Sequence, residues 1–184
     1  RYTYALRYFG FAQGDIGQAI ILFTDARGDT RAIVGYDDQS VISNLVSQFD
    51  EDKEGFTSKW KEVEAVLVTD ETKSTYQTIN DKLQDYWALN EEIIELGKTV
   101  SDKASRQQAQ SKALNELAPA YEEIDSLMNE LLNEKTSRGE SLDNTLNITT
   151  YILVVAAVIV LVISFNISVR FGRFIARGIA EPVT

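Results

Sequence analysis

The chain has 184 residues, a formal net charge of −10, and neither histidine nor cysteine. These absences exclude a thiolate nucleophile, a histidine general base and an ordinary zinc or iron site. The acidic balance excludes a general nucleic-acid-binding protein, because contacts to phosphates need clustered lysine and arginine. The sequence contains no catalytic constellation, so we expect a protein that is not an enzyme and that uses no cofactor and no metal.

Residues 1–147 repeat apolar positions every seven residues, which is typical of helices packed at shallow angles in a bundle. Helix-stopping glycines and helix-starting caps interrupt the repeat three times, near residues 35–38, 69–71 and 97–102. We therefore predict an all-α fold, an antiparallel up-down-up-down four-helix bundle. Its helices cover residues 1–34, 38–67, 70–97 and 102–147.

Two of these stripes matter for the site. The stripe of the third helix consists of Tyr76, Ile79, Leu83, Tyr86, Asn90 and Ile93, and the stripe of the fourth consists of Leu114, Leu117, Tyr121, Ile124, Met128, Leu131, Lys135, Arg138 and Leu142. Pro119 lies inside the fourth helix, where it removes one backbone hydrogen bond and predicts a local kink.

A membrane segment follows the bundle. No charged residue occurs between Asp143 and Arg170, and the apolar run 148–169 is long enough to span a bilayer as a helix. Arg170, Arg173 and Arg177 come directly after this run, which places the C-terminal end in the cytoplasm. The predicted parts are an extracellular sensing domain (1–147), a transmembrane helix (148–169) and a cytoplasmic segment (170–184).

Alanines recur every seven residues along the first helix, at Ala5, Ala12, Ala19 and Ala26. Small residues on one helix face permit the close approach of another backbone. The stripe fits two interpretations equally, tight packing inside one bundle or the seam of a homodimer.

The candidate site lies near the outer end of the bundle. Arg27 and Thr30 occupy seam positions on the first helix, and Arg31 follows Arg27 by one turn, so that two guanidiniums on one face are suited to a carboxylate. At the same height we expect Tyr86 and Asn90 on the third helix. The fourth helix offers Gln107, Gln108 and Ser111 at that level. The alternative is that both arginines pair with Asp25, Asp29 or other acids of the bundle.

The layout resembles the four-helix-bundle sensor region of bacterial methyl-accepting chemotaxis proteins. The matching features are the outer bundle, its direct run into a membrane span, and the basic exit from Arg170 to Arg177. The ending Gly178-Ile-Ala-Glu-Pro-Val-Thr184 is similar to the opening of a HAMP linker, and residues 13–36 are similar to the first helix of clostridial-type members.

This resemblance implies a homodimeric chemoreceptor in the bacterial inner or plasma membrane. Such a receptor senses a small extracellular molecule, here an organic acid or amino acid, and displaces its last helix. A HAMP unit then passes the displacement to a cytoplasmic domain that controls a histidine kinase and its coupling protein in chemotaxis. Arginines on the first helix are implied to grip a carboxylate. The alternatives are the sensor region of a histidine kinase or nucleotide cyclase, and a membrane-tethered coiled coil without a ligand.

Overall fold

The structure, a computed structural model, describes the backbone of residues 11–180 and the side chains of residues 13–137, 148–161 and 164. Throughout this part of the chain the secondary structure is helical. The elements are α2 (Phe11–Gly35), α3 (Gln39–Glu64), α4 (Asp70–Gly97), α5 (Lys103–Lys112), the π-helical segment η2 (Ala113–Leu117) and α6 (Ala118–Ala180). The chain divides into two parts, Arg1–Gly139 and Glu140–Thr184, and the boundary between them falls within α6.

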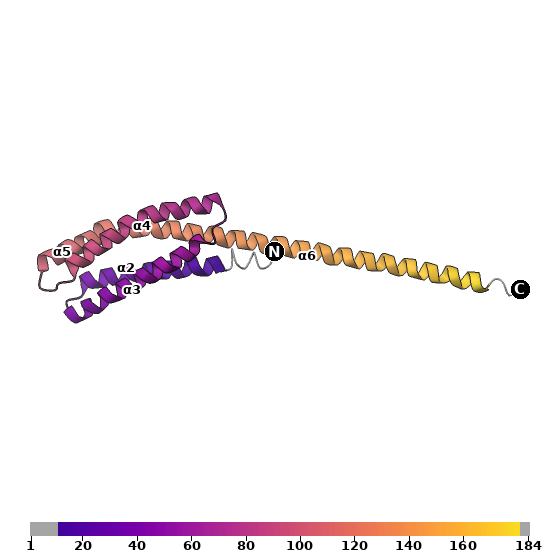
Figure 1. Cartoon of the computed structure of the whole chain (residues 1–184), viewed down its shortest axis with the longest axis horizontal. Helices are drawn as coiled ribbons and strands as arrows, with labels where there is room; N and C mark the ends of the chain where they lie inside the picture. Colours follow the sequence, from indigo (N-terminus) through magenta and orange to yellow (C-terminus); the bar gives the residue numbers. More distant parts are fainter. Residues whose placement is uncertain (1–10, 181–184) are drawn as a thin grey trace. The chain divides into compact units, whose positions relative to one another are not determined.

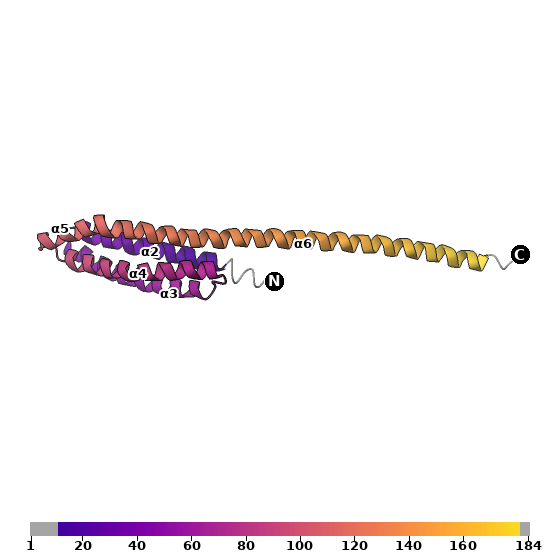
Figure 2. The same cartoon turned by 90° about the horizontal axis from the view of Figure 1, so that it is seen from above.

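Residues 11–139 form the antiparallel bundle, in which α2, α3 and α4 lie side by side with α5, η2 and the first turns of α6 (Figures 1 and 2). The caps predicted from the sequence are present. The Asp38 side chain accepts hydrogen bonds from the first amides of α3, Thr69 forms a capping box at the start of α4, and Asp102 caps α5. Helices α2 and α4 end at Gly35 and Gly97. The predicted all-α bundle is therefore confirmed.

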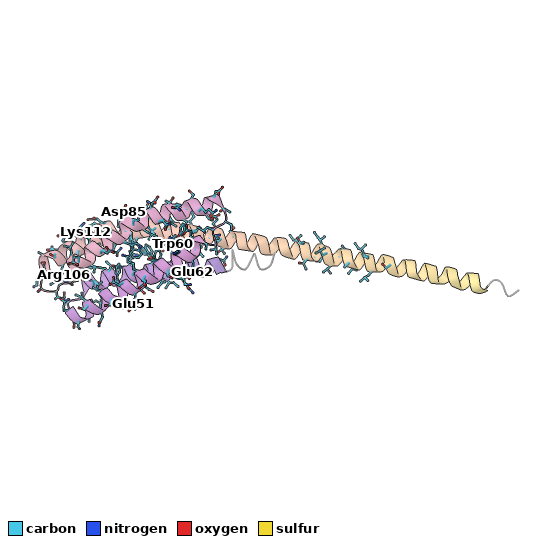
Figure 3. All side chains as sticks on the ribbon, in the orientation of Figure 1. Glu51, Trp60, Glu62, Asp85, Arg106 and Lys112 are labelled. Carbon is cyan, nitrogen blue, oxygen red and sulfur yellow. The ribbon has the colours of Figure 1, made fainter. Side chains whose placement is uncertain are left out.

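Aromatic side chains fill the middle of the bundle. Phe23 packs against rings from three other helices, and its ring lies parallel to that of Tyr121 with the centroids 5.0 Å apart. Trp60 stacks on Tyr76 at 4.8 Å and belongs to the same core (Figure 3). Every predicted stripe position of α4 is buried. The sequence repeat thus locates the core correctly on this helix.

The stripe predicted for the fourth helix is wrong at its first position. Leu114 is 71% exposed, and the preceding Ala113 is buried in its place. The cause is η2, because a π-helical turn holds one more residue than an α-helical turn and rotates the chain before it. Pro119, where we predict a kink, comes two residues after the end of this segment.

The alanine stripe of α2 packs inside the bundle at the positions that the structure describes. Ala19 and Ala26 are fully buried in the core. The side chains of Ala5 and Ala12 lie outside the described residues. The described half of the stripe therefore serves internal packing.

The predicted span 148–169 lies within α6 and is helical. Among the residues that the structure describes, no helical stretch combines the length and the apolar character that a membrane crossing requires. The side chains of 170–184, like those of Arg138 and Leu142, lie outside the described residues.

Candidate functional site

Arg27 and Arg31 line one groove on the surface of the bundle. The groove lies between α2 and the junction of α5, η2 and α6, and has a volume of about 310 Å³. Its lining consists of Arg27, Arg31, Val34, Gly35, Gln110, Ala113, Leu114, Leu117 and Ala118. We call this the arginine groove. It joins two cations and one amide to an otherwise apolar wall.

The partner of Arg27 is an aromatic ring. Its guanidinium carbon lies 3.9 Å from the centroid of Tyr121, the distance of a close cation–π contact. Within the described part of the chain, neither Arg27 nor Arg31 forms an ion pair with Asp25, Asp29 or another acid. A cation–π contact uses the charge of the guanidinium and not its N–H groups, which remain free to donate. Both side chains can therefore offer their donors to an anion in the groove.

Three other predicted site residues form a buried hydrogen-bond network between α2 and α4. The Thr30 hydroxyl donates to Asn90 Oδ1 at 2.8 Å, and Asn90 Nδ2 donates to the backbone oxygen of Tyr86 at 2.8 Å. All three residues are buried, and none lines the arginine groove. The Tyr86 hydroxyl has no hydrogen-bond partner, and burial raises the pKa of that group. This network connects α2 to α4 rather than facing solvent.

The glutamine of the groove is Gln110, not the predicted Gln108. Gln108 is exposed and does not line the groove, as is also true of Gln107 and Ser111. The amide of Gln110 lies in the groove wall and donates to the backbone oxygen of Val34 at 2.9 Å. The residue that α5 contributes to the groove is thus two positions later in the chain than the predicted one.

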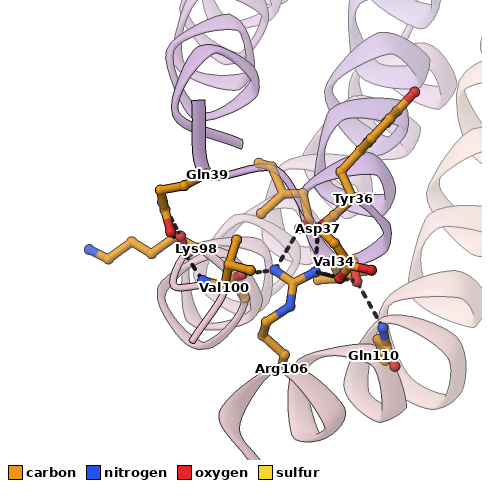
Figure 4. Close-up of polar contacts among 10 residues, drawn as sticks. Val34, Tyr36, Asp37, Gln39, Lys98, Val100, Arg106 and Gln110 are labelled. Carbon is orange, nitrogen blue, oxygen red and sulfur yellow. Dashed lines mark hydrogen bonds and ion pairs between the residues drawn. The ribbon is translucent and has the colours of Figure 1, made fainter. Parts of the chain in front are cut away.

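Arg106 is a buried charged residue that the sequence did not reveal (Figure 4). It is only 5% exposed, and its guanidinium donates to the carbonyl oxygens of Ile33 at 3.3 Å, Val34 at 3.2 Å, Tyr36 and Gly97. These carbonyls belong to the ends of α2 and α4, where backbone oxygens lack helical partners and the helix dipole is negative. Arg106 therefore joins the C-terminal ends of two helices to α5.

A sequence signal for Arg106 does exist. It lies three residues before Ala109 and seven before Ala113, both of which are buried. A stripe extended backwards from these two alanines would have placed Arg106 on the inner face of α5.

Acidic side chains meet where α2 packs against α3. Asp29 is 7% exposed, and one of its oxygens has no hydrogen-bond partner. Burial, together with the nearby carboxylates of Asp52 on α3 and Asp25 on α2, raises the pKa of Asp29 to about 6. Burial and Asp25 also raise the pKa of Asp52. The α2–α3 contact thus contains a carboxyl that takes up a proton more readily than usual.

A second groove lies between α2 and α3 and has a volume of about 430 Å³. It is lined by Gln18, Ile21, Leu22, Gly55, Ser58 and Lys59. Its only charged side chain, Lys59, already pairs with Glu62 at 2.7 Å and with Asp15 at 3.6 Å. The arginine groove is therefore the better candidate for a charged ligand.

Comparison with known proteins agrees with this fold. Residues 12–151 match the family described as a four helix bundle sensory module for signal transduction, the sensory module of chemotaxis receptors. The match covers more than half of the chain, and the chain belongs to this family. No curated protein and no solved structure gives a significant match.

Proposed function

We propose that this chain is the sensor region of a membrane-anchored chemoreceptor whose ligand is a small monocarboxylate with an apolar body. The arginine groove is the observation that carries this proposal. Arg27 and Arg31 supply two guanidiniums one helical turn apart, and each can donate two parallel hydrogen bonds to a carboxylate. Membership of a signal-transduction sensory family supports the role of a receptor.

The rest of the groove favours a ligand with one charge. Beyond the two arginines and Gln110, its lining is Val34, Gly35, Ala113, Leu114, Leu117 and Ala118. A second carboxylate placed against this apolar wall would lose its hydration without gaining a partner. A hydrocarbon or aromatic body would instead bury apolar surface there. The volume of about 310 Å³ is at the lower end of the range typical of small-molecule sites.

The membrane anchor is part of the proposal. The uncharged run 148–169 and the arginines after it favour a span with residues 1–147 outside the cell. A HAMP linker that continues from residues 170–184 would pass the signal to a cytoplasmic output domain. A chemotaxis output through a histidine kinase and its coupling protein is our choice over a kinase or cyclase fused directly to the chain.

The test is ligand binding by the whole chain in detergent micelles. We choose 3-phenylpropanoate as the probe, 3-phenylpropanamide as its uncharged isostere and succinate as a dicarboxylate. At a hundredfold excess over its dissociation constant, a ligand stabilises the folded state by about 2.7 kcal/mol. We expect only 3-phenylpropanoate to raise the unfolding midpoint. Equal effects of the acid and the amide would show that the arginines do not recognise the charge.

A further inference from the structure

The packing register of the last bundle helix changes at η2. In a regular bundle helix, buried positions alternate in steps of three and four residues. The buried positions here are Arg106, Ala109, Ala113, Leu117, Tyr121, Ile124, Met128, Leu131 and Lys135. Three successive steps of four separate Ala109 from Tyr121. The chain therefore contains one residue more than the alternation permits, at the place where the structure has a π-helical segment.

A π-helical turn accommodates such an additional residue. In η2 the amide of Ala118 donates to the carbonyl of Ala113, five residues earlier, whereas an α-helix connects residues four apart. Pro119 comes two residues after the end of η2 and has no N–H, so the α-helical ladder is already incomplete here. Both features confine the irregularity to residues 113–119.

The helix on each side of η2 is held in its own register. Upstream, Arg106 donates to the carbonyls at the ends of α2 and α4, and Lys112 pairs with Glu92 of α4 at 3.1 Å. Downstream, Tyr121 stacks on Phe23 and its hydroxyl lies 2.9 Å from the hydroxyl of Thr24. In this form both sides keep these contacts, and a shift of α5 by one residue would exchange its own contacts for others. The additional residue is held between the two sides as long as both sets of contacts remain.

This arrangement creates one wall of the arginine groove. In an α-helix that kept the register of Leu117, the inward position one turn earlier would be Leu114. The π-helical segment instead turns Ala113 inward and leaves Leu114 exposed, where it lines the groove beside the arginines. The groove in this form depends on the π-helical turn.

We propose that η2 is a ligand-dependent switch. A carboxylate in the arginine groove selects the π-helical form, in which Leu114 faces the ligand. The other form is α-helical, turns Leu114 toward the bundle and shifts α5 relative to the start of α6 by one residue, about 1.5 Å along the axis. Because the complete groove exists only in the first form, the ligand binds the two forms with different affinities, as a population shift requires. This inference rests on the proposed function.

The decisive variant is the deletion of Leu114. The deletion removes the additional residue, so η2 can become α-helical while Arg106 and Tyr121 both keep their contacts. We expect its unfolding midpoint to equal or exceed that of the original chain, since a strained turn becomes regular. The matched control is the deletion of Glu122, an exposed residue of α6 beyond η2. That deletion moves Ile124 and every later buried position by one residue, and should lower the midpoint.

The switch is read by hydrogen exchange of the amides of residues 112–118 and by the thermal shift, with and without 3-phenylpropanoate. In the original chain we expect the probe to slow exchange and raise the midpoint. In the chain that lacks Leu114, the probe should change neither. Leu114→Ala keeps the chain length and the π-helical turn, so it should weaken the response without abolishing it.

The outcomes separate the switch from the proposed function. If the probe acts equally on the original chain and the Leu114 deletion, the groove binds a carboxylate but η2 is not a switch. If the Leu114 deletion destabilises as much as the Glu122 deletion, the register argument is wrong whatever the probe does. If the original chain does not respond to 3-phenylpropanoate at all, the proposed function fails and the switch fails with it.

Discussion

The guanidinium of Arg27 on α2 lies 3.9 Å from the ring centroid of Tyr121 on α6. The same ring stacks on Phe23, and its hydroxyl lies 2.9 Å from that of Thr24. A cation–π contact uses the charge of the guanidinium and leaves its N–H donors available. Arg27 is thus held in place by an apolar partner while it presents donors to the arginine groove, and it touches the helix that follows the π-helical turn.

Arg27→Ala should abolish the response to 3-phenylpropanoate, with a loss of affinity of at least about tenfold, the equivalent of about 1.4 kcal/mol. The stability of the chain without a ligand should fall by only about 0.5–1 kcal/mol, because that is the usual worth of an accessible cation–π contact. Arg27→Lys should lose nearly as much affinity, since an ammonium does not reproduce the planar fork. Titration calorimetry and urea denaturation measure the two quantities.

The control for these variants is Gln108→Ala, which changes an exposed α5 residue outside the groove. It should leave affinity and stability unchanged. Unaltered probe binding by Arg27→Ala would move the site away from the arginine groove. Unfolding of Arg27→Ala without a ligand would make Arg27 a structural residue.

Arg106→Met should destabilise the bundle by about 3 kcal/mol or more. Methionine keeps much of the apolar volume but removes the donors for the carbonyls of Ile33, Tyr36 and Gly97, and each buried acceptor without a partner costs about 1–3 kcal/mol. The matched control is Lys112→Met, which removes ion pairs to Glu92 and Glu116 near the surface and should cost at most about 1 kcal/mol. Urea denaturation measures the free energy of unfolding of both variants. Equal decreases in the two variants would refute the special role of Arg106.

The sequence predicts the helices of this bundle well because each helix start is determined by residues close to it in the chain. Asp38, Thr69 and Asp102 each bond to amides within the next few residues, so neighbouring residues alone determine where α3, α4 and α5 begin. The apolar repeat of α4 is equally local, since its strict steps of three and four need no knowledge of the partner helices.

The site is harder to predict because it depends on where distant segments meet. Leu114 continues the stripe of Leu117 by simple periodicity, and only the anchoring of both ends of the helix reveals that one residue is additional. Arg106 stands in a polar stretch and becomes buried because the ends of α2 and α4 converge on it. Arg27 and Arg31 are visible as a pair on one helix face, but the apolar wall opposite them comes from residues more than 80 positions later.

The proposed topology can be tested because the chain contains no cysteine. Ser101→Cys, in the turn at the outer end of the bundle, should react with a membrane-impermeant maleimide in intact bacterial cells. Thr184→Cys should react only after the cells are opened, since the arginines after residue 169 favour the cytoplasm. Equal labelling of both variants in intact cells would refute the span or its orientation.

Replacing Thr30 and Asn90 together should cost less stability than the sum of the two single replacements. Thr30→Val leaves Asn90 Oδ1 without its buried donor, at about 1–3 kcal/mol, whereas after Asn90→Leu the Thr30 hydroxyl can still donate to the backbone oxygen of Ala26 at 3.1 Å. The double variant removes both polar groups and should recover at least about 1 kcal/mol relative to the sum of the single losses. A double-mutant cycle by urea denaturation measures this coupling. Additive losses would mean that the 2.8 Å contact contributes nothing.

The stability of the chain should depend on pH through Asp29. Its pKa is raised to about 6 in the folded state by burial and by the carboxylates of Asp52 and Asp25, against about 3.9 for an unfolded aspartate. Between these two values the folded state binds more protons than the unfolded state, so the free energy of unfolding decreases as the pH rises from about 4 to about 6. Above about pH 7 the loss is complete, and we expect it to amount to about 2–3 kcal/mol. Asp29→Asn is a neutral isostere that needs no proton and should remove this loss.

The measurement is urea denaturation of the original chain and of Asp29→Asn at pH 4.5 and pH 7. The caps Asp38 and Asp102, whose lowered pKa values come from their own hydrogen bonds to Ser40 and Ser105, contribute equally to both proteins and cancel in the difference. Asp50→Asn, at an exposed position of α3, serves as the control for the removal of one negative charge. The advantage of Asp29→Asn over the original chain should grow from pH 4.5 to pH 7, and Asp50→Asn should show no comparable growth. A difference that stays constant with pH would mean that Asp29 ionises normally in the folded state.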